Sequence, residues 1–285
     1  MPVIKALLAH LSDLPGETAR LDLELLLCAA LGKPRSFLFA WPEYELTEAE
    51  HSQFKRLRAE RESGVPVAYL LGEREFWSLS FTVNEHVLVP RPETELLVEV
   101  ALALPLERPR NQPPSQFLRT ADLGTGSGAI AIALGKERPN WSIAAVDASI
   151  DALAVAMTNA DRHDVSHIEF FHGSWFEPLK EKNFSLILSN PPYIAERDPH
   201  LALGDVQFEP RTALTPGATG MEAITILAEE APNHLLFGGF LYFEHGHDQG
   251  AQSRDLLASR GFEQVETHCD HAGLERVTGG CWRNS

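Results

Sequence analysis

The sequence is poor in cysteine and has no long hydrophobic run. Its three cysteines, Cys28, Cys269 and Cys281, are scattered and form no CxxC pair, so neither a disulfide framework nor a zinc site is indicated. No segment approaches the roughly 18 apolar residues of a membrane-spanning helix, and the N-terminus has too short an apolar run for a signal peptide. We therefore expect a cytoplasmic protein with no metal and no membrane contact.

Basic residues are also few, which argues against a long contact with bare nucleic acid. The 285-residue chain has 24 lysines and arginines against 40 acidic residues, a net charge of −16. Nucleic-acid binding is normally driven by basic side chains that displace counterions from phosphates. We expect no direct nucleic-acid partner, although a local basic patch is compatible with this composition.

The first third of the chain changes from helical to β-rich patterns. Apolar residues recur at helical spacing over 18–31, and Thr47 with Glu50 forms a capping box ahead of a second helix. Residues 76–83 and 86–89 then read as two strands, with a turn at Asn84 and Glu85 between them. We expect three parts: a helical substrate-docking domain over 1–75, a β-hairpin linker over 76–91 and a larger domain over 92–285.

The larger domain alternates strands and helices from residue 117 onward. This alternation implies parallel strands with crossover helices on both faces of the sheet. The last two predicted strands are joined by a short loop, so they pair antiparallel if they are neighbours. The fold class expected is α/β, with a mostly parallel sheet and an antiparallel C-terminal strand.

A glycine loop follows the first strand of this domain. The stretch DLGTGSG places Gly124, Gly126 and Gly128 before a helix, where the missing side chains let the backbone pass close to a ligand. Asp147 closes the next strand, where a carboxylate can accept hydrogen bonds from two ribose hydroxyls. Neither a P-loop nor a GxGxxG spacing is present. The pattern favours a ligand with a ribose and no pyrophosphate; a loop that only permits tight packing is the alternative.

This pattern resembles the class I methyltransferases, which bind S-adenosyl-L-methionine, over about residues 117–285. The resemblance implies a Rossmann-like fold in which the glycine loop wraps the methionine and ribose of the cofactor and Trp175 lies beside the adenine. For Trp175, an ordinary core position is the alternative. The implied cofactor-binding residues are Gly124, Thr125, Gly126, Ser127, Gly128, Asp147, Trp175 and Asn190.

The segment Asn190-Pro191-Pro192-Tyr193 follows the apolar run FSLIL. Asn190 would lie at the carboxyl end of a strand, where doubly wound sheets bind ligands. The two prolines contribute no N–H donors, so the segment presents carbonyl oxygens together with the Asn190 side-chain oxygen. Tyr193 adds a flat ring for stacking. The segment predicts a slot for a conjugated NH₂ group, with a simple proline turn as the alternative.

Two groups carry such an NH₂: a nucleobase with an exocyclic amine, and a glutamine or asparagine side chain. Their nitrogen lone pair is delocalised, and acceptors on both N–H bonds would fix its direction. Methyl transfer to this nitrogen can then be catalysed by alignment of the two reactants, without a nucleophile from the enzyme. We expect Asn190, Pro191 and Tyr193 to be catalytic and these three with Pro192 to bind the substrate. Amino-directed nucleic-acid methyltransferases and protein glutamine methyltransferases both stay open at this point.

Over its whole length the chain resembles the bacterial release factor glutamine methyltransferases (PrmC, also called HemK). The resemblance rests on the helical N-terminus and on VPRPETE, SNPPYI, FEPRTAL and GGFLYFEHG. It implies N5 methylation of the glutamine in the Gly-Gly-Gln motif of class I release factors. We expect the protein to be a monomer. The Arg-Pro-x-Thr-Glu form at Arg91–Glu95 favours this branch over relatives that act on a ribosomal protein. N6-adenine methylation of DNA or RNA, and cofactor binding without activity, are the alternatives.

Seven polar residues have no assigned role. Three of them could act in the site or only begin a helix: Arg91, Glu93 and Glu95. Two could order a loop over the substrate or form a surface ion pair: Glu209 and Arg211. Two belong to a polar strand end more simply than to a metal site: His245 and His247.

Overall fold

The computed structural model describes residues 1–9, 18–106, 118–179 and 184–283. The chain forms two compact units, and each is described by itself. The first comprises Met1–Glu73 together with Ala202–Phe208, and the second comprises Arg74–Leu201 together with Glu209–Ser285. The short segment 202–208 therefore belongs to the N-terminal unit although it is distant in sequence.

The first unit is helical. Thr47 and Glu50 form the predicted capping box, in which each side chain bonds the backbone N–H of the other. Apolar side chains of α2 and α4 form a buried core, and the buried Arg61 bonds Asp22 and Asp205. Its helices are α1 Ile4–Ala9, α2 Ala19–Leu31, α3 Arg35–Ala40, α4 Glu48–Glu62 and α5 Val67–Leu71, and the 202–208 segment contributes the 3₁₀ helix η3 Gly204–Phe208.

A hairpin is present, but the predicted position of its turn was wrong. Strands β1 Glu73–Phe76 and β2 Leu79–Thr82 flank a turn at Trp77 and Ser78 rather than at Asn84 and Glu85. Trp77 and Ser78 both have positive φ, 52° and 57°, which two-residue hairpin turns require and which glycine or asparagine usually supplies. The Trp77 N–H donates to the Glu95 carboxylate over 2.7 Å, which gives Glu95 a structural role at this turn.

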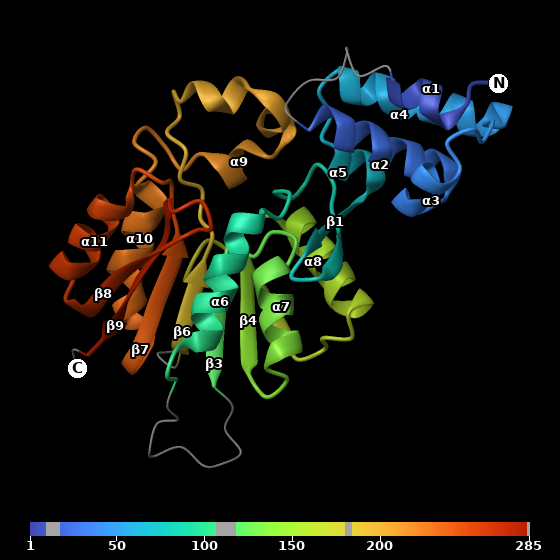
Figure 1. The fold of residues 1–285 in the computed structure, drawn as a ribbon. Helices are drawn as coiled ribbons and strands as arrows, with labels where there is room; N and C mark the ends of the chain where they lie inside the picture. Colours follow the sequence, from blue (N-terminus) through green and yellow to red (C-terminus); the bar gives the residue numbers. More distant parts are fainter. Residues whose placement is uncertain (10–17, 107–117, 180–183, 284–285) are drawn as a thin grey trace. The chain divides into compact units, whose positions relative to one another are not determined.

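The second unit is built on a seven-stranded sheet in the order β5-β4-β3-β6-β7-β9-β8 (Figure 1). Strand β9 runs antiparallel to both its neighbours, and the paired strands from β5 to β7 run parallel. This confirms the predicted Rossmann-like fold class. The strands are β3 Arg119–Leu123, β4 Ser142–Asp147, β5 Ile168–His172, β6 Phe184–Ser189, β7 Leu235–Glu244, β8 Phe262–Cys269 and β9 Glu275–Trp282.

Helices cover both faces of this sheet. Figure 1 shows α6 and α7 beside each other on one face. Successive strand residues point to opposite faces, so Leu186 and Leu188 pack in the core under α6 and α7 while Ile187 packs in the core under α10. The helices are η1 Pro92–Thr94, α6 Glu95–Ala103, α7 Ala129–Glu137, α8 Ile150–Arg162, η2 Pro199–Ala202, α9 Arg211–Leu214, α10 Glu222–Glu230, η4 Ala231–Asn233 and α11 Gly250–Ser259.

One buried asparagine connects the hairpin to the glycine loop. Asn159 on α8 is fully buried, and its amide nitrogen donates to the carbonyls of Thr82 and Ser127 at 3.0 and 2.9 Å. Its side-chain oxygen accepts from the Thr82 N–H over 2.7 Å. Because all these groups are paired, Asn159 fixes the end of β2 against the loop that follows β3.

Candidate active site

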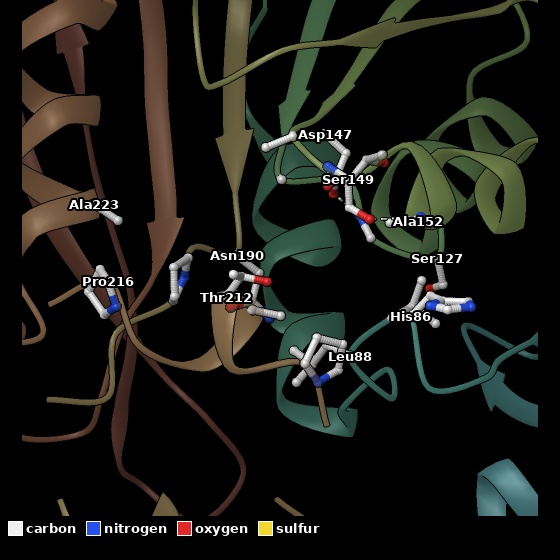
Figure 2. Close-up of a pocket in the computed structure, with 18 of the residues that line it drawn as sticks. His86, Leu88, Ser127, Asp147, Ser149, Ala152, Asn190, Thr212, Pro216 and Ala223 are labelled. Atoms are coloured by element: carbon white, nitrogen blue, oxygen red, sulfur yellow. Dashed lines mark hydrogen bonds between the residues drawn. The ribbon is translucent and has the colours of Figure 1, made fainter. Parts of the chain in front are cut away.

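A cavity of about 570 Å³ opens at the carboxyl ends of the parallel strands. Ligands bind at this edge in doubly wound sheets, and the volume suits a cofactor-sized molecule. Figure 2 shows Asp147 and Ser149 near one part of the cavity, Asn190 and Thr212 in its middle, and Pro216 and Ala223 at another side. The structure therefore brings the two predicted motifs to one cavity. Of the predicted site residues, the cavity is lined by Gly124, Thr125, Gly126, Ser127, Asp147, Trp175, Asn190 and Pro192.

The glycine loop is held against the end of β4 by its own amides. The N–H groups of Gly124 and Thr125 donate to the carbonyl of Val146 at 2.8 and 2.9 Å, and that of Gly126 donates to Asp147 at 2.8 Å. These amides are engaged within the protein, so they do not form an open nest for a phosphate. Binding of a ligand without a pyrophosphate at this loop stays a prediction.

Gly128 is the N-cap residue of α7, and its position leaves no room for a side chain. Its φ is 82°, and a Cβ there would lie 2.9 Å from Ile132 and 3.2 Å from Ala156. The residue therefore supports the close packing of α7 and α8 behind the loop. Gly128 itself does not lie among the lining residues.

Asp147 lies where β4 ends and faces the cavity. One of its oxygens accepts from Gly126 and the other accepts from the Ser149 N–H over 2.8 Å. Burial raises the pKa of this carboxyl, while the backbone bonds act in the opposite direction. Each carboxylate oxygen can accept more than one hydrogen bond, so both oxygens of Asp147 can still accept a hydrogen bond from a ligand hydroxyl.

A second carboxyl, Asp122, lies behind the loop and was not singled out from the sequence. It is fully buried on β3, and one oxygen accepts from the Thr125 hydroxyl (2.6 Å) and the Ala131 N–H (3.2 Å). Its other oxygen has no hydrogen-bond partner among the described residues. Burial raises the pKa of Asp122 to about 7. A half-paired buried carboxyl is costly to ionise.

Asn190 follows β6 directly, and its side-chain amide is fixed by a chain of hydrogen bonds. Its nitrogen donates to the Thr94 hydroxyl over 3.0 Å, and Thr94 donates to Glu244 over 2.6 Å. Asn190 and Thr94 both line the cavity. Thr94 and Glu244 were missed from the sequence, although a lone acid in the apolar strand FLYFE was an available signal.

The rest of the Asn-Pro-Pro-Tyr segment is held by contacts in the protein interior. The Tyr193 ring packs in a hydrophobic cluster, its hydroxyl donates to Glu244 over 3.0 Å, and it does not line the cavity. Burial and the Glu244 charge raise the pKa of this phenol well above its ordinary value. Pro191 is buried and likewise does not line the cavity. Stacking of a substrate on Tyr193 stays a prediction.

The Tyr193 backbone is braced by two further residues. Gln249 donates to the Tyr193 carbonyl over 3.0 Å. Gly220, with a φ of 82°, approaches the same carbonyl so closely that a Cβ would lie 2.4 Å from its oxygen. The segment therefore depends on contacts from two loops that follow it in the chain.

Trp175 lines the cavity beside the glycine loop. A Cβ at Gly124 would lie 3.8 Å from its ring, and its φ of 48° is unusual for a bulky residue. Such a conformation is retained where surrounding contacts or function require it. Its placement beside an adenine stays a prediction.

Arg91 and Glu209 form an ion pair at the cavity. Glu209 is buried, bonds the half-buried Arg91 guanidinium, and accepts from the Val89 N–H over 3.3 Å. It therefore ties the VPRP segment to the FEPR segment. Arg211 is exposed at the start of α9.

The charged lining of the cavity is mainly acidic. Three carboxylates, those of Glu85, Asp147 and Glu222, line it together with Arg91 and His86. This balance does not resemble the basic groove that a nucleic-acid backbone requires.

In the described ranges, no group of three or more histidine, cysteine or acidic side chains could hold a metal ion. His245 is buried, with its ring nitrogens near the Gly246 carbonyl (2.8 Å) and the Thr278 hydroxyl (2.7 Å). In the same ranges, no helix has both the length and the apolar character needed to cross a membrane.

Two solved structures have a similar fold. A methyltransferase from Pyrococcus furiosus matches 81% of this chain and all of its own, with a TM-score of 0.54 and 16% identity. The human METTL16 catalytic domain in complex with an RNA hairpin matches 77% of this chain and 81% of its own, with a TM-score of 0.54 and 17% identity. At these identities the likeness shows the fold alone.

Sequence comparisons show the family. Residues 3–72 match the PrmC N-terminal domain, and residues 109–217 match the methyltransferase small domain. The release factor glutamine methyltransferase of Pseudomonas aeruginosa is 47% identical over 96% of both chains. That of Vibrio cholerae is 43% identical over 98% of this chain and 96% of its own, and that of Escherichia coli is 45% identical over 93% and 92%. The chain is thus a methyltransferase, and it belongs to the family of release factor glutamine methyltransferases.

Proposed function

We propose that the protein methylates the side-chain amide nitrogen (N5) of the glutamine in the Gly-Gly-Gln motif of class I peptide chain release factors, with S-adenosyl-L-methionine as methyl donor. One observation carries this proposal: the Asn190 nitrogen is held by Thr94, which leaves the Asn190 oxygen as an acceptor at the cavity. Such an acceptor suits an N–H donor. The family supports release factors as the substrate class.

The cavity lining fits this cofactor. Asp147 can accept from two ribose hydroxyls, and the engaged amides of the glycine loop suit a ligand without phosphates. The carboxyl of Asp122, whose pKa burial raises to about 7, places negative charge behind the loop in its ionised form, and this charge favours a cationic ligand. Trp175 offers a flat apolar surface at the same cavity. When bound, S-adenosylmethionine supplies an electrophilic methyl group on a positively charged sulfur.

The residues of the chain act mainly by positioning the amide. The lone pair of an amide nitrogen is delocalised, as the C–N rotation barrier of roughly 18–20 kcal/mol indicates. We assign the acceptance of one N–H bond to the Asn190 oxygen, which lies at the cavity, and that of the other to the backbone of Pro191, although Pro191 does not line the cavity. Both contacts draw electron density to the nitrogen and fix the direction of its lone pair. Alignment of two reactants can contribute on the order of 7–11 kcal/mol. The proton leaves after transfer, when the nitrogen has become acidic.

Recognition of the release factor is assigned to the helical unit, residues 1–75 in the sequence-based division. Two aromatic side chains of this unit, Phe39 and Trp41, are exposed by 61% and 63%. Exposed aromatic residues are typical of protein interfaces. We further propose that the protein acts as a monomer in the cytoplasm and contacts no nucleic acid directly.

The function is tested by methyl transfer from tritiated S-adenosylmethionine to purified class I release factor. We expect label on the release factor, in the peptide that contains the Gly-Gly-Gln motif. Bare DNA, bare RNA and ribosomal protein are assayed in parallel under the same conditions. Labelling of nucleic acid or of ribosomal protein without labelling of the release factor would contradict the proposal.

Replacing Asp122→Asn should stabilise the ligand-free protein and weaken cofactor binding. The asparagine oxygen can accept the bonds of Thr125 and Ala131, and no charge is buried. Because the pKa of Asp122 is about 7 in the folded protein and lower in the unfolded chain, its ionisation opposes folding. This cost is absent near pH 4, grows as the pH rises toward 7, and amounts to a few kcal/mol at most.

The measurements for this variant are thermal midpoints from pH 4 to 8 and calorimetric binding of S-adenosylhomocysteine. The stability gain over wild type should be largest at pH 8 and shrink toward pH 4. Binding at pH 8 should weaken by about tenfold, since the negative charge behind the glycine loop is lost. A stability difference that does not change with pH would contradict the assignment.

A further inference from the structure

We infer that Thr94 and Glu244 are positioning residues that set the orientation of the Asn190 amide, so that the cavity presents an acceptor to the substrate nitrogen. The inference deepens the proposed function and rests on it for the identity of the substrate. The hydrogen-bond relay itself, from Asn190 through Thr94 to Glu244, consists of contacts within the protein and does not depend on the substrate.

Glu244 holds both ends of the Asn-Pro-Pro-Tyr segment. It ends β7, the strand beside β6, and is 1% exposed. One of its oxygens accepts from Thr94 over 2.6 Å and the other accepts from the Tyr193 hydroxyl over 3.0 Å. The carboxylate therefore acts on Asn190 through Thr94 and on Tyr193 directly.

The single hydroxyl proton of Thr94 decides the direction of the relay. In its ionised form the Glu244 carboxyl only accepts hydrogen bonds, so Thr94 then directs its proton to Glu244. Toward Asn190 the same hydroxyl can then only accept, and the Asn190 nitrogen must face it. A flipped amide would place the Asn190 oxygen against the Thr94 oxygen with no proton between them. The relay thus keeps the Asn190 oxygen free for a donor in the cavity.

This direction bears on which substrate is accepted. With its oxygen toward the cavity, Asn190 matches an NH₂ group and opposes a carboxylate of similar shape. A flipped amide would present its own N–H bonds to the substrate nitrogen and lose the match. Thr94 and Glu244 thereby contribute to the choice of a glutamine side chain over a glutamate, although Glu244 itself does not line the cavity.

A purely structural role does not explain a carboxylate at this position. The two hydrogen-bond partners of Glu244 are neutral hydroxyls, and burial raises the pKa of its carboxyl, against the opposing effects of the bonds from Thr94 and Tyr193 and the charge of Arg276. A neutral glutamine would cost less to bury. A glutamine, however, can donate to Thr94 and reverse the relay, which a carboxylate cannot do.

The test compares Glu244→Gln, Thr94→Val and Thr94→Ser in steady-state methylation of release factor at saturating cofactor. Glu244→Gln and Thr94→Val should each lower kcat by about tenfold to a hundredfold, with KM for the release factor within about threefold of wild type. Thr94→Ser keeps the hydroxyl and should stay within about threefold. The double variant Thr94→Val with Glu244→Gln should be no slower than the slower single variant, because both break one relay.

A control of the same residue type is available on β8, the strand beyond β9. Glu266 accepts from the Tyr242 hydroxyl over 2.6 Å, as Glu244 does from Tyr193, but its bonds to Tyr242 and His268 lead to no residue that lines the cavity. Glu266→Gln should leave kcat unchanged. Circular dichroism and calorimetric binding of S-adenosylhomocysteine confirm that each variant is folded. A folded Glu244→Gln with wild-type kcat, or Thr94→Ser as slow as Thr94→Val, would overturn the inference.

A measurement without substrate separates this inference from the proposed function. In the ligand-free enzyme, the Asn190 side-chain amide proton that faces Thr94 should exchange slowly with solvent by NMR. Thr94→Val should accelerate this exchange by about tenfold or more. Unchanged exchange overturns the relay even if release factor is methylated. Failure of the wild-type enzyme to methylate release factor overturns the function, whereas accelerated exchange still supports the relay.

Discussion

A release factor whose loop glutamine is replaced by glutamate should be methylated about 10⁴-fold or more slowly than the wild-type factor. The Asn190 oxygen at the cavity would face a carboxylate oxygen in place of an N–H bond. A site built to accept hydrogen bonds rejects a partner that cannot donate them. The acceptors of the site and those of the glutamate both lose their hydrogen bonds to water, and no hydrogen bond between them replaces these. Single-turnover transfer from tritiated cofactor measures the ratio.

The control for this result is binding of the altered release factor. If docking depends on other surfaces, the glutamate variant should inhibit methylation of the wild-type factor at a concentration close to the wild-type KM. If the glutamate variant is labelled weakly but still inhibits methylation of the wild-type factor, the loss arises at Asn190 and not in docking. Labelling of the glutamate variant at the wild-type rate would contradict acceptance of an NH₂ group there.

The fold was largely predictable because its signals are local. Alternating strands and helices from residue 117 indicated a parallel sheet, and the Thr47–Glu50 capping box fixed the start of α4. The turn of the hairpin was not predictable in the same way. Trp77 and Ser78 adopt positive φ without being glycine or asparagine, and a bond to Glu95 stabilises the turn from eighteen residues away.

Membership of segment 202–208 in the helical unit also lacked a local signal. It depends on Arg61, which reaches Asp205 as well as Asp22. A basic residue in the helix pattern of α4 reads as a solvated position, and only the folded chain brings an acid from 144 residues away beside it. Sequence periodicity reports the burial of a face but not the partner that covers it.

The candidate site divides in the same way. The glycine loop and Asp147 form one short motif, so the sequence brings them together without knowledge of the fold. Thr94 and Glu244 are 150 residues apart and meet because α6, which follows Thr94 directly, packs against β7. The available signal was a single acid within an apolar strand, which also marks Asp122 in β3. Such acids are candidates for function because an unneeded buried charge is costly.

Asn190→Ala should lower the rate of methyl transfer by about 10²–10³-fold, the usual effect of removing one preorganised hydrogen-bonding group from an active site. It removes the acceptor and also leaves the Thr94 hydroxyl without its donor, while the Glu244 bonds to Thr94 and Tyr193 persist. The loss should therefore lie in the chemical step. Single-turnover rates at saturating cofactor and release factor measure it directly.

The comparison variant is Asn140→Ala, which removes an exposed asparagine amide from the turn before β4. It should retain the wild-type rate, and both variants should keep the wild-type thermal midpoint within a few degrees. If Asn190→Ala binds S-adenosylhomocysteine normally and still transfers methyl within threefold of wild type, the acceptor role of Asn190 is wrong. The NH₂ group would then have to be held by the backbone of the proline segment alone, and the relay from Glu244 could not influence the reaction.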